Sequence, residues 1–282
     1  MNRLTRRSLL GAGGLLAAST LVGTRSKAQA SPAPPPPWGD RPGGEALAQG
    51  LEGLGDAQRY EAFADQFLAG NVPGFLRLLT PVELVAPAGH VGAQRATVYV
   101  SPDYLAVGTN EDHLRVPLDL PQAARVARSL GMALPTPRIV DAVYAAASTV
   151  LAPSPLPPTS QMRSLPYVVR HNMLVERARA GRSVLPLIAG HKKDLVLTKR
   201  LRAQPDRVAI YGWHRPDGRP IQPLSLVHGK GYADYSHGVR LIARYTVVDG
   251  VQVDLFEAMA DPAMAALFSD EGCVEDADGL MG

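Results

Sequence analysis

The sequence has 282 residues, of which 46% are hydrophobic, 20% charged and 6% aromatic, which excludes a disordered, collagen-like or coiled-coil chain. The length is sufficient for one large or two small domains with a buried core. The formal charge of +3 comes from residues 1–30, which hold five basic residues and no acidic one, and the remainder has 24 basic against 26 acidic residues, a charge of −2. Bulk charge therefore gives no reason to expect a nucleic acid or an anionic membrane as a partner.

The first 30 residues have the order of an export signal. Arg6 and Arg7 form an arginine pair, residues 9–22 are uncharged, and residues 28–30 (Ala-Gln-Ala) have the small-x-small form of a signal-peptidase site. The uncharged run has 14 residues, whereas a helix needs ~20 to cross a bilayer. Residues 1–30 resemble bacterial twin-arginine signal peptides. The resemblance implies export by the twin-arginine machinery to the periplasm or the medium, and no stable membrane anchor is expected.

The mature chain is expected to begin with a tether and a helical region. Residues 31–45 are rich in Pro and Gly, which is typical of an extended tether. Apolar residues at helical spacing predict helices within residues 46–80. The period then changes, and the alternation of residues predicts a short antiparallel meander of three strands at 97–100, 104–107 and 113–116.

The rest of the chain alternates between helical and strand patterns. Helices are expected at 121–131, 138–150, 167–180 and 255–268, and strands at 183–188, 208–211, 239–242, 245–248 and 251–253. These patterns predict an α+β fold with N-terminal helices, the short meander, and a mixed or antiparallel sheet in the C-terminal half. We expect a single body over 46–269, with a seam at the Pro-rich loop 152–160 and an acidic tail at 270–282.

Cysteine-based sites are excluded, and a nucleotide site is not indicated. Cys273 is the only cysteine, so an intramolecular disulfide, a cysteine metal cluster and an iron–sulfur site are excluded. No glycine-rich phosphate loop follows a predicted strand, so a nucleotide cofactor is not indicated.

The reactive side chains are concentrated in three polar segments, residues 190–194, 211–215 and 228–240, each beside a predicted strand. Loops at strand ends commonly carry catalytic and binding groups, so we expect the three segments to form one pocket. The candidate catalytic residues are His191, Asp194, His228, Asp234, Ser236 and His237. The candidate substrate-binding residues are Lys192, Lys193, Trp213, His214, Tyr235 and Arg240.

One of these segments is similar to a known motif. His228-Gly229 followed by Ser236-His237-Gly238-Val239-Arg240 resembles the His-Gly and Ser-His-Gly-Cys-Val/Ile-Arg elements of L,D-transpeptidases, over about 14 residues. The nucleophilic cysteine of that family is absent, because Val239 directly follows Gly238, and the covalent mechanism of the family needs the thiolate. The resemblance implies only a related way of presenting polar groups to a cell-wall peptide.

Three mechanisms remain open at this stage. A serine mechanism would use Ser236, with His191 or His228 as base and Asp194 or Asp234 to orient the base. A metal mechanism would place a single divalent ion such as zinc on residues drawn from His191, Asp194, His228 and His237, although no cofactor is indicated by a specific motif. A metal-free acid–base mechanism would pair Asp103, Asp194 or Asp234 with a histidine, while Lys192, Lys193 and Arg240 bind an anionic substrate group and aromatic residues stack on sugar rings.

His191 is the residue on which we place most weight. It follows an apolar strand and Gly190, and Lys192 and Lys193 are expected to lower its pKa and keep it neutral near pH 7. The sequence therefore predicts an exported enzyme, a hydrolase or related transferase, that acts on a cell-envelope glycan or peptide polymer. The alternative is a non-catalytic periplasmic module that binds a glycan or a peptide.

Overall fold

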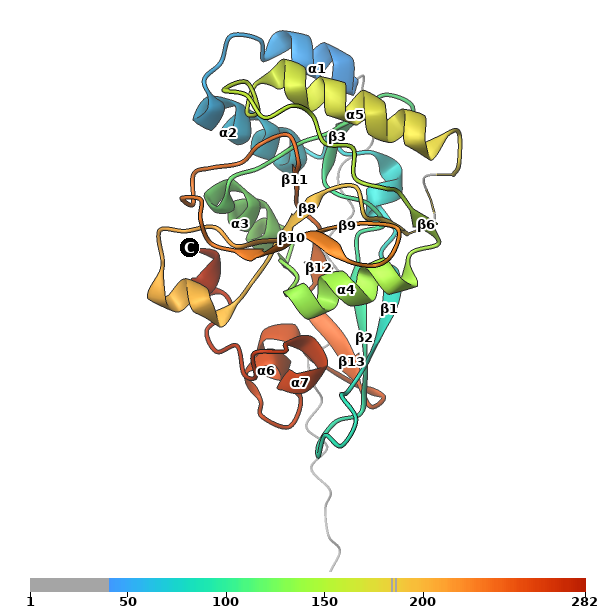
Figure 1. The fold of residues 1–282 in the computed structure, drawn as a ribbon, viewed down its shortest axis with the longest axis vertical. Helices are drawn as coiled ribbons and strands as arrows, with labels where there is room; N and C mark the ends of the chain where they lie inside the picture. The colour runs from blue at the N-terminus through green and yellow to red at the C-terminus, as the bar shows by residue number, and fades with distance from the viewer. Residues whose placement is uncertain (1–40, 184, 186) are drawn as a thin grey trace, which may run out of the picture. The chain divides into compact units, whose positions relative to one another are not determined.

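Helices and several small sheets make up the fold, as expected for the α+β class (Figure 1). The computed structural model describes residues 41–183, 185 and 187–282, so the predicted export signal and most of the tether lie outside the described residues. Within the described part, the α-helices are α1 (Gly44–Gly50), α2 (Asp56–Leu68), α3 (Leu120–Ser129), α4 (Pro137–Ala146), α5 (Leu165–Arg179), α6 (Leu255–Ala260) and α7 (Ala265–Phe268). The 3-10 helices are η1 (Gly74–Arg77), η2 (Lys199–Ala203) and η3 (Gly279–Met281).

Local sequence signals explain where several helices begin and end. The Asp119 side chain accepts a hydrogen bond from the Gln122 amide at the start of α3, and Thr136 caps α4 in the same way. Both helices have a proline in the first turn, where its missing N–H costs nothing. The single helix predicted at 255–268 is instead split into α6 and α7, because Asp261 precedes Pro262 and takes an extended conformation.

The larger sheet is built around β2 (Arg95–Val100), which has partners on both edges. One edge pairs antiparallel with β1 (Thr80–Val85), and the other pairs with β13 (Tyr245–Val248) and β12 (Ile242–Ala243). β14 (Val251–Asp254) and β5 (Met132–Ala133) extend the sheet outward. The predicted strands at 245–248 and 251–253 form the expected hairpin, whereas β1 was not predicted.

The predicted meander is only partly formed. β3 (Ala106–Gly108) and β4 (His113–Arg115) make an antiparallel hairpin, but β2 does not pair with β3 and belongs to the larger sheet. The turn at 101–103 separates the two sheets, since the Ser101 amide donates to Leu241 of another segment rather than to β3.

A second sheet of four strands lies in the C-terminal half, in the order β10-β9-β8-β11, and is mixed. β10 (Pro220–Ser225), β9 (Ile210–His214) and β8 (Lys193–Leu195) are antiparallel, and β11 (His237–Gly238) pairs with β8 in parallel. Two further strands, β6 (Thr149–Val150) and β7 (Ile188–Ala189), form a parallel pair. The strand expected at 183–188 is therefore shorter and later than predicted, and Val184 and Pro186 lie outside the described residues.

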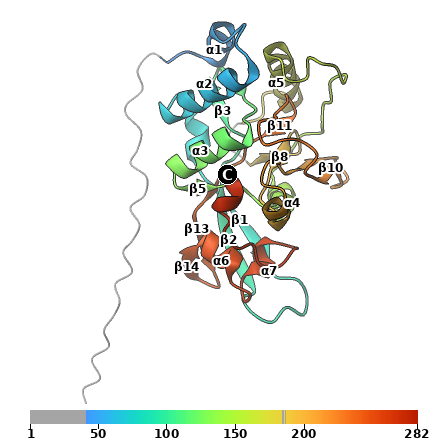
Figure 2. The ribbon, with the colours of Figure 1, turned by 90° about the vertical axis from the view of Figure 1, so that its left-hand side faces the viewer.

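Helices surround these sheets in a way that both views show. α1 and α5 lie at one end of the body and α6 and α7 at the other, beside β13 and β14 (Figures 1 and 2). α2 packs against α3, and α4 packs between β1 and β9. Tyr60, Phe63 and Phe67 of α2 are buried in the main hydrophobic core, because their spacing places them on one face of the helix. No helix of the described residues is long and apolar enough to cross a membrane.

The two segments that the sequence sets apart are packed onto the body. In the Pro-rich loop 152–160, Leu156 is buried and its amide donates to the Tyr235 hydroxyl at 2.8 Å. In the tail 270–282, Val274 and Met281 are fully buried. The acidic tail therefore contributes to the core.

Candidate functional site

The three polar segments lie on neighbouring strands of the second sheet. β8 pairs with β9 on one side and with β11 on the other. Asp194 in β8 is opposite Tyr211 in β9 and Gly238 in β11. The structure therefore brings the three segments side by side, although the segment at 190–194 contains a strand where a loop was expected.

Asp194 borders a cavity of about 10 Å³, which has room for about one water molecule. Two other candidate residues, His214 and Arg240, also line this space, which we call the Asp194 cavity. Its lining residues are Tyr104, Val140, Val143, Tyr144, Ala189, Gly190, Asp194, His214 and Arg240.

The Asp194 carboxyl group is buried with one oxygen bonded and the other free. The Tyr104 hydroxyl donates to Oδ2 at 2.7 Å, whereas Oδ1 has no hydrogen-bond partner among the described residues. Burial raises the pKa of Asp194 to about 6, against the opposing effects of Arg240 and the Tyr104 hydrogen bond. A carboxyl group with this pKa can release and accept a proton close to neutral pH.

Arg240 provides a fixed positive charge beside Asp194. Its guanidinium donates to the carbonyl oxygens of Ser101 and Ile188, and it lies 4.5 Å from the ring centre of Tyr104. Its Nε is 4.0 Å from Asp194 Oδ1 and has no hydrogen-bond partner in the described part of the chain. Two buried polar atoms thus face each other with capacity to bind a water molecule or a polar group of a ligand.

His214 is oriented by a carboxylate on a helix. Its Nε2 is 2.8 Å from Asp141 Oδ1 of α4, and its ring stacks on Tyr144 with the centroids 4.5 Å apart. Asp141 also accepts a hydrogen bond from the Tyr211 hydroxyl. A carboxylate that holds one ring nitrogen fixes the orientation and tautomer of the imidazole, as in catalytic His–Asp pairs.

The backbone conformation of β9 beside the cavity requires glycine at position 212. The φ angle of Gly212 is +103°, which side chains rarely adopt, whereas a Cβ atom there would make ordinary contacts with His214 Cε1 and Asp194 Oδ2 at 3.4 and 3.5 Å. The next residue, Trp213, also has a positive φ of +55°, which is uncommon for a large side chain and marks a strained bend in β9. His214, at the end of this strand, lines the cavity.

His191 belongs to a separate buried ion network. Its Nε2 is 3.1 Å from Asp103 Oδ1, and Arg115 donates two hydrogen bonds to Asp103 Oδ2 at 2.9 and 2.6 Å. Arg115 also pairs with Glu176 of α5 at 2.6 Å. Burial alone would raise the pKa of Asp103, but Arg115 and His191 hold it well below its usual range.

The pKa of His191 is lowered, as predicted, but for a different reason. Burial is the main cause, Asp103 opposes it, and Arg115 and Arg240 add to it, whereas the two following lysines are not among the main causes. His191 is 1% exposed and does not line the Asp194 cavity. Its contact with Asp103 gives it the geometry of a residue that positions the neighbouring Gly190 and Tyr104.

His228, Asp234, Ser236 and His237 form a third group, which we call the Asp234 cluster. Ser236 is fully buried and its hydroxyl donates to Asp234 Oδ1. His237 Nε2 is 3.9 Å from Asp234 Oδ2, and the His228 and His237 rings are 6.1 Å apart. Among the described residues, His191 makes no hydrogen bond or ring contact with this cluster. The single pocket expected from sequence is therefore divided, and Ser236 has the geometry of a turn-stabilising hydroxyl.

The remaining candidate residues lie between these groups. Lys192 is 1% exposed, its ammonium group donates to the Tyr235 carbonyl oxygen, and burial lowers its pKa to about 7. Tyr235 is 2% exposed, and its hydroxyl hydrogen-bonds to the backbone of Leu156. Lys193 lies over the Trp213 ring at 5.1 Å. Lys192 and Tyr235 are thus inaccessible to a substrate in this conformation.

No set of three or more His, Cys, Asp or Glu side chains within the described residues is arranged to hold a metal ion. The four ligands considered from sequence are divided among the Asp103 network, the Asp194 cavity and the Asp234 cluster. The metal alternative therefore has no assembled ligand set in this part of the chain.

Sequence reasoning missed two residues of the Asp194 cavity and its surroundings. Tyr104 lies in a predicted strand with nothing to mark its hydroxyl as functional. Asp141 lies in a predicted helix, and the only local signal is its spacing three residues before Tyr144, which places both on one helical face.

Comparisons of the chain with protein-family models, with curated proteins and with solved structures find no match.

Proposed function

We propose that this chain is an exported enzyme, a hydrolase or a related transferase, that acts on a glycan or peptide polymer of the cell envelope. The localisation is proposed from the resemblance of residues 1–30 to twin-arginine signals, and it is the periplasm or the medium. The reaction class is proposed from the Asp194 cavity. The observation that supports it best is a buried carboxyl group of raised pKa, with a free oxygen, in the same cavity as an oriented histidine and a fixed arginine.

The proposed reaction uses these three side chains in distinct roles. Asp194 as carboxylate removes a proton from a water molecule, and the water oxygen forms a bond to the electrophilic carbon of the substrate. His214 as imidazolium gives a proton to the leaving nitrogen or oxygen as its bond to that carbon breaks. Arg240 stabilises the negative charge that develops on the substrate oxygen. Transfer of the proton from Asp194 to His214 then restores the starting state.

The experiment measures release of soluble fragments from purified envelope polymer by the mature chain, with mass spectrometry of the products. Asp194→Asn and His214→Gln should each lower the rate by roughly 10²–10⁴-fold, because each removes a proton-transfer group. Asp206→Asn is the matched control, since Asp206 is an exposed carboxylate that pairs with the partly exposed Lys230. Incorporation of heavy oxygen from labelled water distinguishes hydrolysis from transfer, and a chelator tests the metal alternative.

The alternative is a non-catalytic module that binds the same polymer. It is favoured by the small volume of the Asp194 cavity, which admits about one water molecule and no larger group without rearrangement. Polymer binding without any product, unaffected by Asp194→Asn, would support the module and refute the enzyme.

A further inference from the structure

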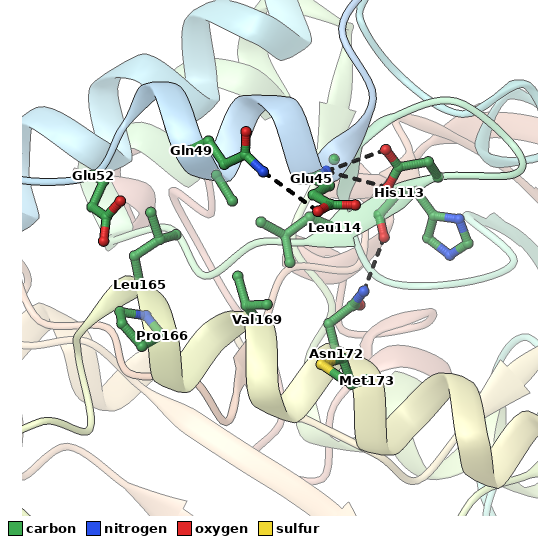
Figure 3. Close-up of a pocket in the computed structure, with 13 residues that line it drawn as sticks. Glu45, Gln49, Glu52, His113, Leu114, Leu165, Pro166, Val169, Asn172 and Met173 are labelled. Atoms are coloured by element: carbon green, nitrogen blue, oxygen red, sulfur yellow. Dashed lines mark hydrogen bonds between the residues drawn. The ribbon is translucent and has the colours of Figure 1, made fainter.

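A groove lies between α1 and α5 and shares no lining residue with the Asp194 cavity (Figure 3). Its volume is about 560 Å³. Leu114 of β4 and Leu165 and Val169 of α5 point into the space between the two helices. Met173 is 50% exposed at one end of this apolar floor. A groove of this size is large enough for several side chains of a ligand.

The charge along the groove has one sign. Glu45 of α1, Glu52 in the turn after α1 and Asp112 line it, and no lysine or arginine of the described residues does. The Asp112 carboxylate is held in place because both of its oxygens accept hydrogen bonds from the Glu45 amide, at 3.2 and 3.3 Å. The groove therefore combines an aliphatic floor with a negative wall, and it complements a ligand that has aliphatic groups and a positive charge.

The chemistry of the floor distinguishes a peptide from a glycan. Among the described residues no Phe, Tyr or Trp lines the groove, and the imidazole of His113, which does, is only 6% exposed, so little aromatic surface is offered on which a sugar ring can stack. Short aliphatic side chains fit the floor, and the flexible Met173 can adapt to them. The side-chain amide of Gln49 lies beside Glu45 at the α1 wall, where it can bond a peptide backbone.

We propose that this groove binds a short peptide segment with a free ammonium group and small aliphatic side chains. The inference deepens the proposed function and rests on it for the source of the peptide, which is the peptide part of the envelope polymer. The ammonium group faces Glu45 and Glu52, and the aliphatic side chains cover Leu114, Leu165 and Val169.

One hydrogen-bonded frame joins the groove to the Asp194 cavity. Asn172 of α5 lines the groove and accepts a hydrogen bond from Arg115 at 3.2 Å. Arg115 pairs with Asp103, and the next residue, Tyr104, lines the cavity. The relative positions of groove and cavity are thus fixed by buried side chains, as a polymer bound at both places requires.

The test is calorimetric titration of the mature chain with three probes. The first is acetyl-Ala-Lys-Ala-amide, the second is the same peptide acetylated on the lysine amine, and the third is a tetramer of N-acetylglucosamine. We expect the first probe to bind and the other two to bind at least about threefold more weakly, the effect of one partly exposed charge pair. These titrations use the Asp194→Asn variant of the mature chain, so that turnover of the probe does not disturb the measured binding heat.

Variants locate the binding in the groove. Glu52→Gln should weaken binding of the first probe about threefold, and Met173→Lys about tenfold, because it adds a like charge and removes an aliphatic contact. Glu61→Gln on α2 is the matched control and should change nothing, because Glu61 is exposed and does not line the groove. Circular dichroism and melting verify folding, and if Met173→Lys does not fold, Glu45→Gln with Glu52→Gln replaces it.

Several results would overturn the inference. These are equal binding of the acetylated peptide, tighter binding of the sugar tetramer, or unchanged binding by Met173→Lys. Trp38 lies in the tether at 31–45, so a change in its fluorescence emission in Met173→Lys without peptide would assign the groove to the chain's own tether. A parent that self-associates with rising concentration, when Met173→Lys does not, would assign the groove to a second copy. If Asp194→Asn abolishes turnover but the peptide does not bind, only the proposal of a peptide-binding groove is refuted. If the peptide binds but turnover does not depend on Asp194, only the proposed enzymatic function is refuted.

Discussion

At the scale of single residues, the buried charges of this protein fall into paired and unpaired ones. Asp103 is held by Arg115 and His191, so its charged form is stabilised and its pKa lies well below the usual range. Asp194 has one hydroxyl donor, and its nearest guanidinium nitrogen, Arg240 Nε, is 4.0 Å away, so burial outweighs both and raises the pKa of Asp194 to about 6. Two carboxyl groups with the same low exposure therefore contribute to stability with opposite dependence on pH.

The raised pKa of Asp194 predicts a specific pH dependence of stability. Between the unfolded value near 3.8 and the folded value near 6, the folded state binds more protons, so this group's contribution to stability falls as pH rises and is lowest above pH 6. Asp194→Asn should remove this cost and raise the free energy of unfolding at pH 7.5 relative to the parent by about 1–3 kcal/mol.

Urea unfolding of parent and variant at pH 4 and pH 7.5 tests this prediction. The difference in the free energy of unfolding between parent and variant should be smaller at pH 4, because the Asp194 carboxyl group of the folded parent is already protonated there. A difference that grows toward acid would contradict the burial argument, and Asp206→Asn serves as the exposed control.

The Asp103–Arg115 pair is expected to be essential for folding stability. Both side chains are 1% exposed, so Arg115→Met leaves the buried Asp103 carboxylate without its arginine, held only at Oδ1 by His191 and the Tyr104 amide. Breaking one partner of a buried pair costs about 3–5 kcal/mol. Urea unfolding at pH 7 should show this loss, while Arg170→Met, at an exposed position on α5, should stay within about 0.5 kcal/mol of the parent. An Arg115→Met variant as stable as the control would show that the pair contributes nothing.

At the scale of elements, local signals predicted the helices better than the strands. Proline in the first turn and the Asp119 and Thr136 caps lie within a few residues of the helix starts, and the predicted helices 121–131 and 138–150 begin within one residue of α3 and α4. The partners of β2 lie far along the chain, at β12 and β13, so no local pattern could show that it leaves the meander. Short strands such as β8 also have too few residues to show the alternation of apolar and polar side chains that predicts a strand.

Close packing of β11 against its surroundings leads to a prediction for one glycine. A Cβ atom at Gly238 would lie 2.5 Å from Tyr104 Cδ1 and 2.9 Å from Lys192 Cβ, distances that real Cβ atoms do not show. Gly238→Ala must therefore push Tyr104 away from Asp194, and we expect a loss of about 1–3 kcal/mol in unfolding free energy. Thermal melting checks this.

Gly231→Ala is the matched control, since it lies in the same segment and has open space around the added atom. Its melting temperature should match the parent. Equal melting of Gly238→Ala and Gly231→Ala would mean that β11 does not pack against Tyr104 as described.

At the scale of the whole molecule, the C-terminal tail closes the core. Val274 and Met281 are fully buried, and Glu271 accepts hydrogen bonds from Thr198 and Arg200. Deletion of residues 270–282 removes these charged contacts and the buried side chains of Val274, Leu280 and Met281, worth ~1.5–3 kcal/mol each. Because total stability is typically ~5–15 kcal/mol, we expect loss of a cooperative melting transition. Deletion of Gly282 alone, which is exposed, should leave melting unchanged.

Export is the second prediction at this scale. Replacement of Arg6 and Arg7 by lysine should leave the precursor in the cytoplasm, because the twin-arginine machinery reads the arginine pair. Fractionation of cells that express the parent or the double variant measures this. Unchanged delivery of the variant to the periplasm would refute the twin-arginine assignment.

The amino-acid sequence by itself determined the fold class and the three segments that carry the polar side chains, because composition, period and turn residues are local properties. It also carries the export prediction, in residues 1–30. Only the tertiary structure decided which side chains share a cavity. Tyr104 and Asp194 are 90 residues apart in the sequence, and Asp141 and His214 are 73 apart, so no local spacing of residues could predict either contact. The same holds for charge, since His191, Asp194 and Lys192 owe their shifted pKa values chiefly to burial, which depends on packing between distant segments.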